Sequence, residues 1–463
     1  MKSTGTQVST TILTNFRYHS EPALRMMRRF TIGRIKGEWV NFLPPIQGGK
    51  FEPEDEGIVM DDSSSEEEGL QVFKHTQPSS SASSSIMDSE FDHYPSLQPE
   101  VQHEITQKYR ALEEKLWKGG YYECHFSHYL PELFRYTTLA ILSYVALQYG
   151  WYCTSALFLG LMWHQLVFTA HDAGHMGITH DPIVDTTIGI IIADFIGGLS
   201  IGWWKKSHNV HHLVTNHPEH DPDIQLMPFF AVSARLLDSL TSTFYDRVME
   251  YDAFSQFMVQ FQHWTYYPIL CFGRFNLYFL SWEHLILATG MAKTGITQRF
   301  RLLECVGMVF FWYWFGYLLV YRSIPTWTLR VIYVLISHIV TMPLHVQITL
   351  SHYSMSTTDF GPAESFPQKM LRTTMDVDCP PFLDFIHGGL QFQAVHHLFP
   401  RAPRHRLREI QPFVREFCNE VGVKYVICGF VEGNKEVIGR LRAIARHARM
   451  MKECHDWVVE SSE

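Results

Sequence analysis

Residues 136–170 are YTTLAILSYVALQYGWYCTSALFLGLMWHQLVFTA, and these 35 residues include no Asp, Glu, Lys or Arg. A helix that crosses a bilayer once needs only about 20 apolar residues, so the stretch is too long for one span. Gly150 lies near its middle between two aromatic residues, and glycine allows the backbone of a tight turn. The sequence therefore predicts two antiparallel membrane helices, at roughly 132–149 and 152–170.

A second pair of charge-free runs follows at 305–321 and 331–358, separated by Arg322 and a proline-containing link. The last run has 28 residues, which is more than the bilayer needs. Its C-terminal end, with His345 and His352, is therefore expected to project from the membrane as helix. The expected fold is an all-α membrane protein with four transmembrane helices and a histidine-rich cytosolic cap.

Two further apolar stretches are expected to lie at the membrane surface. Residues 183–204 contain Asp185 and Asp194, which are costly in a span that faces lipid, so this stretch is predicted as an interfacial or re-entrant helix. Residues 266–290 are rich in aromatic side chains, which favour the headgroup level of a bilayer. An amphipathic helix within 101–130 is expected to lead into the first span.

The charges predict how the chain is oriented. Four spans place both termini and residues 171–300 on one side, where the arginines of the C-terminal segment also lie. Cytoplasmic loops carry an excess of Lys and Arg, so that side is predicted to be the cytosol. The multi-pass protein is expected in the endoplasmic reticulum membrane, with both termini and the histidine clusters cytosolic.

Composition excludes several classes of protein. Of the 463 residues, 18% are charged, against about 25% in soluble globular proteins. The net charge of −9 comes from residues 52–100, which hold 13 Asp and Glu but one Lys; without them the charge is balanced, which excludes a globally basic nucleic-acid binder. The eight cysteines form no CxxC pair, which argues against a disulfide scaffold or a thiolate zinc site.

Residues 52–100 are also rich in serine, with eleven Ser, and poor in large apolar side chains. Such a segment buries too little surface to fold. It is predicted to be a disordered acidic linker between an N-terminal segment (1–51) and the main domain (101–450), which a C-terminal tail (451–463) follows.

Three short histidine clusters lie beside the predicted spans. They are HDAGH (171–175), HNVHH (208–212) and QAVHH (393–397). Helix positions i, i+3 and i+4 share one face, so each cluster is expected to point its side chains at a common atom. The seven histidines are His171, His175, His208, His211, His212, His396 and His397, and Gln393 takes the first place of the third cluster.

An all-imidazole set without cysteine suits Zn, Cu, Fe or Ni. Seven ligands exceed what one ion accepts, so two ions are expected. His352 is predicted to complete the set, and His345 is a weaker candidate as a ligand or as a partner of one. Asp172 and Asp221 are expected to accept the second ring N–H of ligating histidines. Such a centre at a membrane surface fits oxygen activation next to an aliphatic chain, whereas a two-metal hydrolase would usually add bridging carboxylates.

The three clusters resemble the HxxxH, HxxHH and [HQ]xxHH boxes of the membrane fatty acid desaturase superfamily. The glutamine at the first place of the third box, Gln393, resembles the pattern of the front-end branch of that superfamily. Longer strings are similar to fungal delta-8 sphingolipid desaturases: NHPEHDPDIQLMPFFAVS (216–233), YYPILCFGRFNLYFLSW (266–282), PLHVQITLSHYSM (343–355) and HGGLQFQAVHHLFPRAPRHRLR (387–408). The resemblance implies two iron ions held by the seven box histidines and His352, with Gln393 nearby. The implied reaction is O2-dependent trans-desaturation between C8 and C9 of the sphingoid base of a ceramide, with electrons from cytochrome b5 and its NADH reductase.

Residues 16–51 resemble the last part of a cytochrome b5 domain, and His19 falls where its second haem ligand would be. The first-ligand segment, HPGG, does not occur in the sequence, and one axial histidine holds haem poorly. Residues 1–51 are therefore interpreted as a truncated remnant that does not bind haem, and a separate cytochrome b5 is the expected donor. The arginines of 401–408 are expected either to dock that donor or to face the membrane.

The boxes leave other functions open. A front-end fatty acyl desaturase (delta-5 or delta-6) or a lipid hydroxylase would use the same metal centre, because tunnel shape rather than the boxes sets the substrate. From a different class, a redox-silent membrane interaction protein would retain the fold without an input of electrons.

Overall fold

The computed structural model describes residues 93–287 and 296–462. The predictions for residues 1–51, including His19, and for residues 52–92 of the linker lie outside these ranges. The chain divides into two compact units, whose described parts are 93–106 with 360–366 and 107–359 with 367–462, the latter less the gap at 288–295. In the first unit, the backbone N–H of Ser365 donates a hydrogen bond to Gln102 Oε1 at 2.9 Å.

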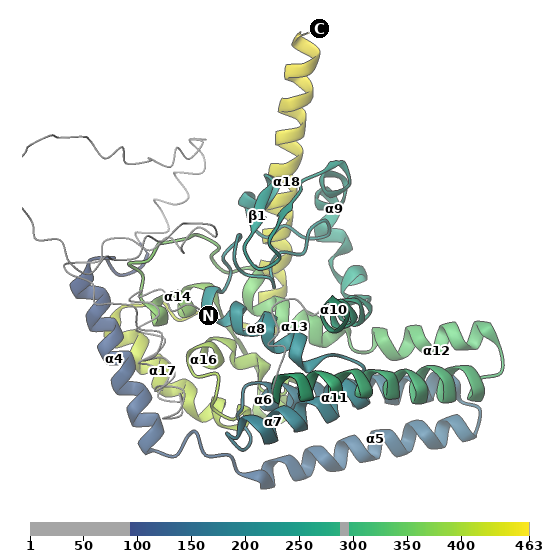
Figure 1. The fold of residues 1–463 in the computed structure, drawn as a ribbon. Helices are drawn as coiled ribbons and strands as arrows, with labels where there is room; N and C mark the ends of the chain where they lie inside the picture. Colours follow the sequence, from purple (N-terminus) through teal and green to yellow (C-terminus); the bar gives the residue numbers. More distant parts are fainter. Residues whose placement is uncertain (1–92, 288–295, 463) are drawn as a thin grey trace, which may run out of the picture. The chain divides into compact units, whose positions relative to one another are not determined.

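The predicted first hairpin is present in the second unit. Helices α5 (Leu130–Gln148) and α6 (Tyr152–Gly174) lie side by side (Figure 1). Gly150 has a φ of +75° in the turn between them, a conformation that glycine adopts without strain. Helix α6 runs four residues beyond the predicted end at 170, so that it carries the first histidine of the HDAGH cluster on its last turn.

The second predicted pair is also helical, but its last helix is broken. Helix α11 (Ile296–Phe311) continues through a π-helical segment, η4 (Trp312–Arg322), and α12 (Trp327–Ile339) returns beside it. The expected single helix at 331–358 is instead α12 followed by α13 (Met342–Tyr353). Pro343 lies in the first turn of α13, where its missing N–H costs nothing. The single-helix prediction was therefore wrong at residues 340–341.

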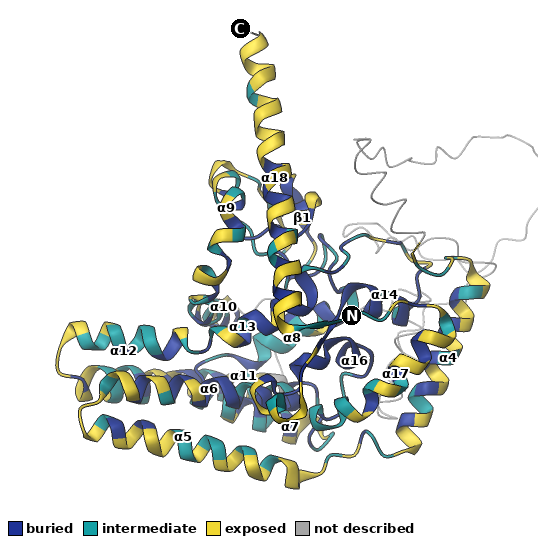
Figure 2. Cartoon of the chain, turned by 180° about the vertical axis from the view of Figure 1, so that it is seen from behind, coloured by how far each residue is buried: buried dark blue, intermediate teal, exposed yellow. Residues whose placement is uncertain are grey.

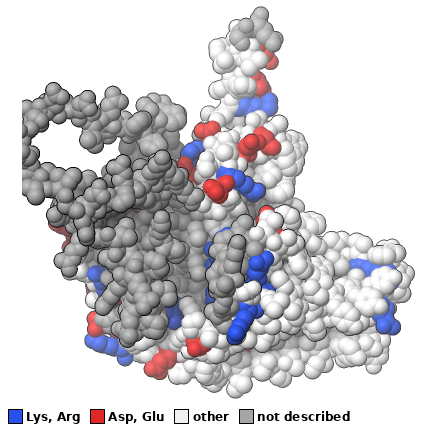
Figure 3. All heavy atoms as spheres, viewed as in Figure 1, with Lys and Arg blue, Asp and Glu red and all other residues white. Residues whose placement is uncertain are grey.

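Among the described residues, three helical stretches are long and apolar enough to cross a membrane: Tyr152–Gly174, Gln298–Arg322 and Trp327–Tyr353. The bent pair formed by α7 with its continuation and α8 is a fourth candidate. Within the same described ranges α5 does not reach this standard, although it packs along α6. Figure 3 shows a surface over α11 and α12 that is almost free of charged side chains, as expected of a lipid-facing hairpin.

The predicted interfacial stretch 183–204 consists of α7 (Pro182–Ile190), a π-helical continuation, η2 (Ile191–Ile196), and the start of α8 (Ile201–Val214). The two arms are bent by 118°. Asp185 and Asp194 are fully buried. Asp185 accepts hydrogen bonds from Thr179, and Asp194 accepts one from the backbone N–H of Ile201. Both carboxylates are therefore shielded from lipid, whereas the placement of the bent pair in the membrane stays a prediction.

The second predicted interfacial stretch, 266–290, is divided between two helices. They are α9 (Ala253–Leu270) and α10 (Gly273–Leu287). A short antiparallel hairpin, β1 (Leu240–Ser242) with β2 (Arg247–Met249), precedes them. In Figures 1 and 2, α9 runs across the direction of α5, α6, α11 and α12.

The C-terminal part supplies the rest of the second unit. Its helices are α14 (Phe366–Thr373), α15 (Asp384–His387), α16 (Gln393–Leu398), α17 (Leu407–Val421) and α18 (Phe430–Ser462). Strand β3 (Asp376–Asp378) pairs in parallel with β4 (Ile427–Gly429). Residues 451–462, predicted as a tail, continue α18. Helix α4 (Pro99–Lys118) begins in the first unit and ends in the second, and it corresponds to the predicted amphipathic helix within 101–130.

Two large apolar cores lie in the described part of the second unit. One joins α6 to α11 and α12 around Trp163, Phe311 and Tyr333. The other joins α9, α13 and α18 around Val259, Leu350 and other buried aliphatic side chains. Figure 2 shows that α16 is buried and α13 mostly so, whereas α5 is largely exposed. The elements that carry the histidine clusters thus lie in the best-packed part of the unit.

Candidate metal centre

The histidine clusters lie on the ends of helices that converge. The first cluster ends α6, and the second occupies the last two turns of α8. The third forms α16, and His352 lies in the last turn of α13. Side chains that are up to 226 positions apart, from His171 to His397, are thereby brought to one place.

Within the described ranges, the histidines form two groups with the spacing of metal ligands. In each group, one nitrogen from every member lies within 4.8 Å of the corresponding nitrogens of all the others. The first group is His171, His175, His208 and His396, and the second is His211, His352 and His397. The second group confirms that His352 lies with the box histidines.

His212 lies between the two groups. Its ring stacks on that of His397, with 4.1 Å between the centroids, and its Nε2 lies 3.1 Å from the Nε2 of His208. The second and third boxes each contribute to both groups. The first group contains His208 and His396, and the second contains His211 and His397. The histidines therefore form one continuous cluster with two groups that could each hold a metal ion.

A glycine allows the first two boxes to approach each other. A Cβ atom on Gly174 would lie 2.1 Å from the ring of Trp204 on α8, far inside van der Waals contact. The ring of Trp204 in turn stacks on His208, with centroids 4.3 Å apart. Gly174 thus lets α8 pack closely enough on α6 for His208 to meet the first box.

The ring nitrogens of the centre fit bound metal ions. The Nε2 atoms of His175, His396 and His397 are buried and accept or donate no hydrogen bond within the described part of the chain, and the same holds for Nδ1 of His212 and His352. A buried polar atom without a partner costs roughly 1–3 kcal/mol. Burial also lowers the pKa of His396 and His397 well below the usual value, so both imidazoles are neutral and offer a lone pair.

Two ligand orientations are set by hydrogen bonds on the opposite ring nitrogen. Asp221 Oδ2 lies 2.8 Å from Nδ1 of His211, and the hydroxyl of Thr215 lies 3.1 Å from Nδ1 of His397. Asp221 is held in place by the backbone N–H groups of Asn216 and Asp223. A hydrogen bond at Nδ1 leaves Nε2 to face the metal. Asp221 has the expected contact with a candidate ligand.

Asp172 contacts other partners than expected. It accepts hydrogen bonds from the hydroxyl of Tyr129 at 2.7 Å and from Nε of Arg404 at 2.8 Å. Arg404 also pairs with Glu132 on α5. This buried network links α5 and α6 to the segment that follows the third box. Asp172 therefore fixes the backbone of the first box through Arg404.

The same network bears on the arginines of 401–408. Arg404 is buried between two carboxylates, and Arg408 pairs with Asp384 at 2.5 Å. Arg404 therefore stabilises the region around the third box and is largely shielded from a docking partner, whereas the Arg408 side chain is 33% exposed.

Gln393 is buried at the start of α16, the helix that also carries His396 and His397. Among the described residues, His345 belongs to neither group; its ring packs against Gly273, where a Cβ would lie 3.1 Å away. His217 and His220 stack on each other, with centroids 4.0 Å apart.

Sequence reasoning missed the carboxylates that hold the box helices. Glu304 on α11 accepts hydrogen bonds from the hydroxyl of Ser200 at 2.5 Å and from the backbone N–H of Gly202 at 3.0 Å, which caps the N-terminus of α8. Asp376 accepts one from the backbone N–H of Ala394 at 2.7 Å, at the start of α16. Burial raises the pKa of Asp376 to about 6. Neither carboxylate lies near a box in sequence.

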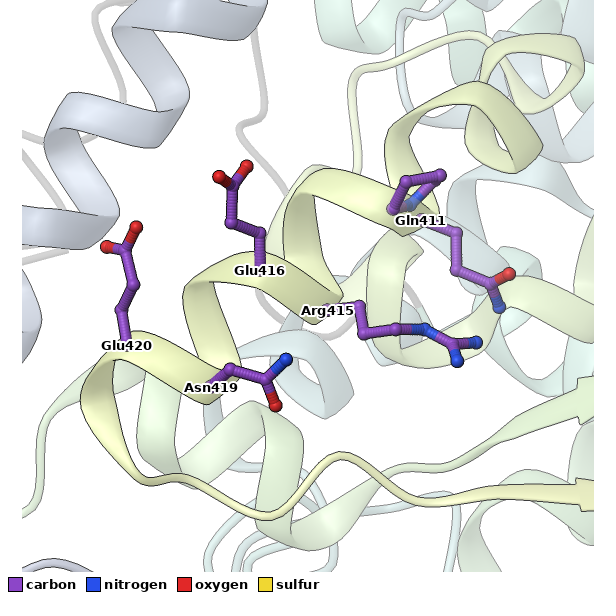
Figure 4. Close-up of a pocket in the computed structure, with 6 residues that line it drawn as sticks. Gln411, Arg415, Glu416, Asn419 and Glu420 are labelled. Carbon is purple, nitrogen blue, oxygen red and sulfur yellow. The ribbon is translucent and has the colours of Figure 1, made fainter.

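A surface hollow of about 650 Å³ lies away from this chemistry. It is lined along one side of α17 by Gln411, Pro412, Arg415, Glu416, Asn419 and Glu420 (Figure 4). No histidine lines it, and its residues all come from a single helix.

Comparison with known proteins agrees with the geometry. The family described as fatty acid desaturase matches residues 148–428. A Delta 8-(E)-sphingolipid desaturase of Emericella nidulans is 54% identical over 94% of this chain and 86% of its own length, and one of Komagataella phaffii is 48% identical over 94% and 85%. A Delta(8)-fatty-acid desaturase of Helianthus annuus is 39% identical over 75% of each chain. The protein is thus a member of the fatty acid desaturase family.

Proposed function

We propose that the protein is an O2-dependent desaturase that introduces a trans double bond between C8 and C9 of the sphingoid base of a ceramide. Relatives named Delta 8-(E)-sphingolipid desaturase, 45–54% identical, support the substrate and the position of the bond. The metal-ligand spacing of the histidines supports the chemistry. That spacing is the observation that carries the proposal, because an all-imidazole set of this kind can hold redox-active ions such as iron.

The proposed cofactors are two iron ions. His171, His175, His208 and His396 would hold one and His211, His352 and His397 the other, with His212 beside both. When bound with O2, such a centre supplies an oxidant strong enough to remove hydrogen from an unactivated C–H bond. Gln393, His345, Asp172 and Asp221 remain proposed as residues that either bind the metal or support its ligands.

The chain's own residues have three tasks. The box histidines bind and orient the metal, and Asp221 and Thr215 fix two of their rings. Buried apolar side chains next to the first box, such as Phe168, exclude water and suit an aliphatic substrate. Helices α6 and α13 end at the centre, so a lipid chain can reach it from the bilayer without crossing water.

The reaction needs an external reductant. Two hydrogen atoms leave the substrate as the C=C bond forms, and O2 is reduced to two water molecules with two further electrons and two protons. A separate cytochrome b5, reduced by its NADH-dependent reductase, is the proposed source. We place the catalytic domain at 101–450 in the endoplasmic reticulum membrane, with the centre and both termini in the cytosol.

Expression in a yeast that lacks Δ8-unsaturated sphingoid bases tests the proposal. Mass spectrometry of the long-chain bases is expected to find a new trans-Δ8 base with the intact chain and none with a His211→Ala variant expressed at the same level. Unchanged bases with the intact, iron-loaded chain would contradict the proposal.

A front-end fatty acyl desaturase is the second candidate. The relative from Helianthus annuus is named as acting on a fatty acid, and a relative from Borago officinalis, 40% identical over 64% of this chain, is named Acyl-lipid (9-3)-desaturase. In the same yeast this function would give new unsaturated fatty acids with unchanged sphingoid bases.

A further inference from the structure

Helix α9 presents an aromatic stripe that no described residue covers. Phe254, Phe257, Phe261 and Trp264 are 54%, 58%, 46% and 72% exposed. They recur every three or four positions, so they share one side of the helix. The opposite side, with Val259 and Tyr266, is fully buried in the apolar core. Aromatic side chains of this kind settle at the headgroup level of a bilayer.

Helix α18 presents a basic stripe where it packs along α9. Lys435, Arg442, Arg446 and Arg449 are exposed at intervals of seven, four and three positions, so they too share one side of their helix. Arg449 donates a hydrogen bond to the carbonyl of Gln260 on α9. The buried side of α18 faces the same core as α9. The two stripes therefore belong to one rigid pair of helices.

An apolar groove of about 600 Å³ lies at the foot of this pair. Met342 and Val346 of α13 and Ile438 of α18 contribute its apolar lining, and Lys435 and Arg442 are its cations. A side chain at Gly439 would meet nothing within 4 Å, so the groove is open along α18. Where the structure describes the chain, no acidic residue lines it.

The groove borders the C-terminal half of a candidate membrane span. Its lining residues Met342, Pro343 and Val346 belong to the candidate span Trp327–Tyr353. Figures 1 and 2 show α9 and α18 running across the direction of α5, α6, α11 and α12. A pair of helices that crosses the direction of the spans is placed to lie along a membrane surface.

We propose that this groove binds an anionic phospholipid, with an acyl chain against Met342 and Val346 and the phosphate headgroup at Lys435 and Arg442. The aromatic stripe of α9 anchors the pair in the same leaflet. A basic residue near an anionic surface contributes about 1 kcal/mol, so two of them favour an anionic over a zwitterionic lipid by roughly tenfold or more. The inference does not depend on the substrate of the metal centre.

The positive charge of the groove and of the basic stripe would also suit the binding of an acidic electron-donor protein. The aromatic stripe and the apolar lining favour lipid, because a transient, charge-steered donor complex needs neither. Donor docking is therefore treated as an outcome of the test.

The test uses the full-length protein in neutral detergent. Brominated phosphatidylserine and brominated phosphatidylcholine are added separately, and native mass spectrometry counts retained lipid while tryptophan quenching follows binding. The intact protein is expected to retain phosphatidylserine at least tenfold more tightly. A Lys435→Gln/Arg442→Gln variant is expected to lose this preference, and Gly439→Leu is expected to lose retained lipid without a change of charge. Lys452→Gln, on the same helix but paired with Asp456, is the matched control.

Equal retention of the two lipids by the intact protein would overturn the proposal, as would an equal loss in the Lys452→Gln control. So would a double variant that keeps its lipid preference but accepts electrons from cytochrome b5 more slowly, because the stripe would then be a donor dock. A thermal unfolding scan of each variant shows whether it is folded, and Gly439→Leu keeps the proposal testable if the double variant is not.

Discussion

Nδ1 of His211 lies 2.8 Å from Oδ2 of Asp221, and both side chains are almost fully buried. The contact fixes which imidazole nitrogen faces the metal, and partners of this kind typically contribute 10–100-fold to metal affinity. We expect Asp221→Asn to weaken iron binding by a factor in that range while the protein stays folded. Chelator competition measures the iron affinity, and Asp238→Asn, at an exposed position, is the control. Equal iron affinities in the two variants would show that the Asp221 carboxylate is unimportant for metal binding.

Single ligand deletions in each group separate metal binding from folding. His211→Ala and His396→Ala are expected to reduce product below detection and to lower the iron content, because each removes a ligand from a different group. Membrane insertion should be unchanged, since neither residue lies in Tyr152–Gly174, Gln298–Arg322 or Trp327–Tyr353, and His211, in the second arm of the bent candidate, has a buried side chain. Iron analysis and membrane fractionation check this against exposed His447→Ala. Full activity in either variant would exclude that histidine as a ligand.

Gly174→Ala tests the close approach of the first two boxes. The new methyl group would lie 2.1 Å from the Trp204 ring, and overpacking of this kind typically costs about 1–3 kcal/mol. Because the displaced ring stacks on His208, we expect at least a tenfold loss of product. The double variant Gly174→Ala/Trp204→Ala should recover part of the iron content. A single variant with unchanged product and melting temperature would contradict this account.

Arg404→Gln removes the cation from a buried network. Asp172 and Glu132 would be left without a counter-charge, and breaking such a buried pair typically costs about 3–5 kcal/mol. We expect a clearly lower melting temperature and loss of activity. Arg406→Gln, whose partner Glu409 is half exposed, is the control and should change stability by about 1 kcal/mol or less. Equal melting temperatures for the two variants would rule out a structural role for the network.

Removal of metal is expected to destabilise the folded protein. Bound ions would give partners to the unpartnered ring nitrogens of the centre, and a ligand that binds the folded state alone raises its stability. Treatment with a chelator should lower the melting temperature, and ferrous iron should restore it. In a His396→Ala/His397→Ala variant the chelator should have a much smaller effect. A melting temperature that changes with neither chelator nor iron would argue against a metal centre.

The parts of the fold that sequence predicted well were those set by local pattern. A charge-free run of 35 residues with Gly150 near its middle is enough to predict α5, α6 and their turn. The i, i+3 and i+4 spacing placed the box histidines on shared helix faces, and the structure brings them together. The break before Pro343 was missed because apolar composition alone does not show where a helix bends.

The parts that were missed depend on contacts between distant residues. Arg404 and Asp172 are 232 positions apart, and Glu304 and Ser200 are 104 apart. Nothing near Glu304 marks it as a cap for α8, because the same residue type is equally common on exposed helix faces. For the same reason the basic stretch 401–408 gave no sign that Arg404 is enclosed between Asp172 and Glu132.

Glu304, which caps α8, follows that helix in the sequence, so the helix is synthesised before its cap. Residues 201–214 leave the ribosome about 90 positions before their capping carboxylate, and the last donors of the centre, His396 and His397, follow later still. A nascent chain therefore carries its early imidazoles for much of translation without the partners that would enclose an ion. The proposed iron centre therefore lacks its full ligand set until the third box is synthesised, so translation products that end before His396 should bind iron more weakly than the full chain.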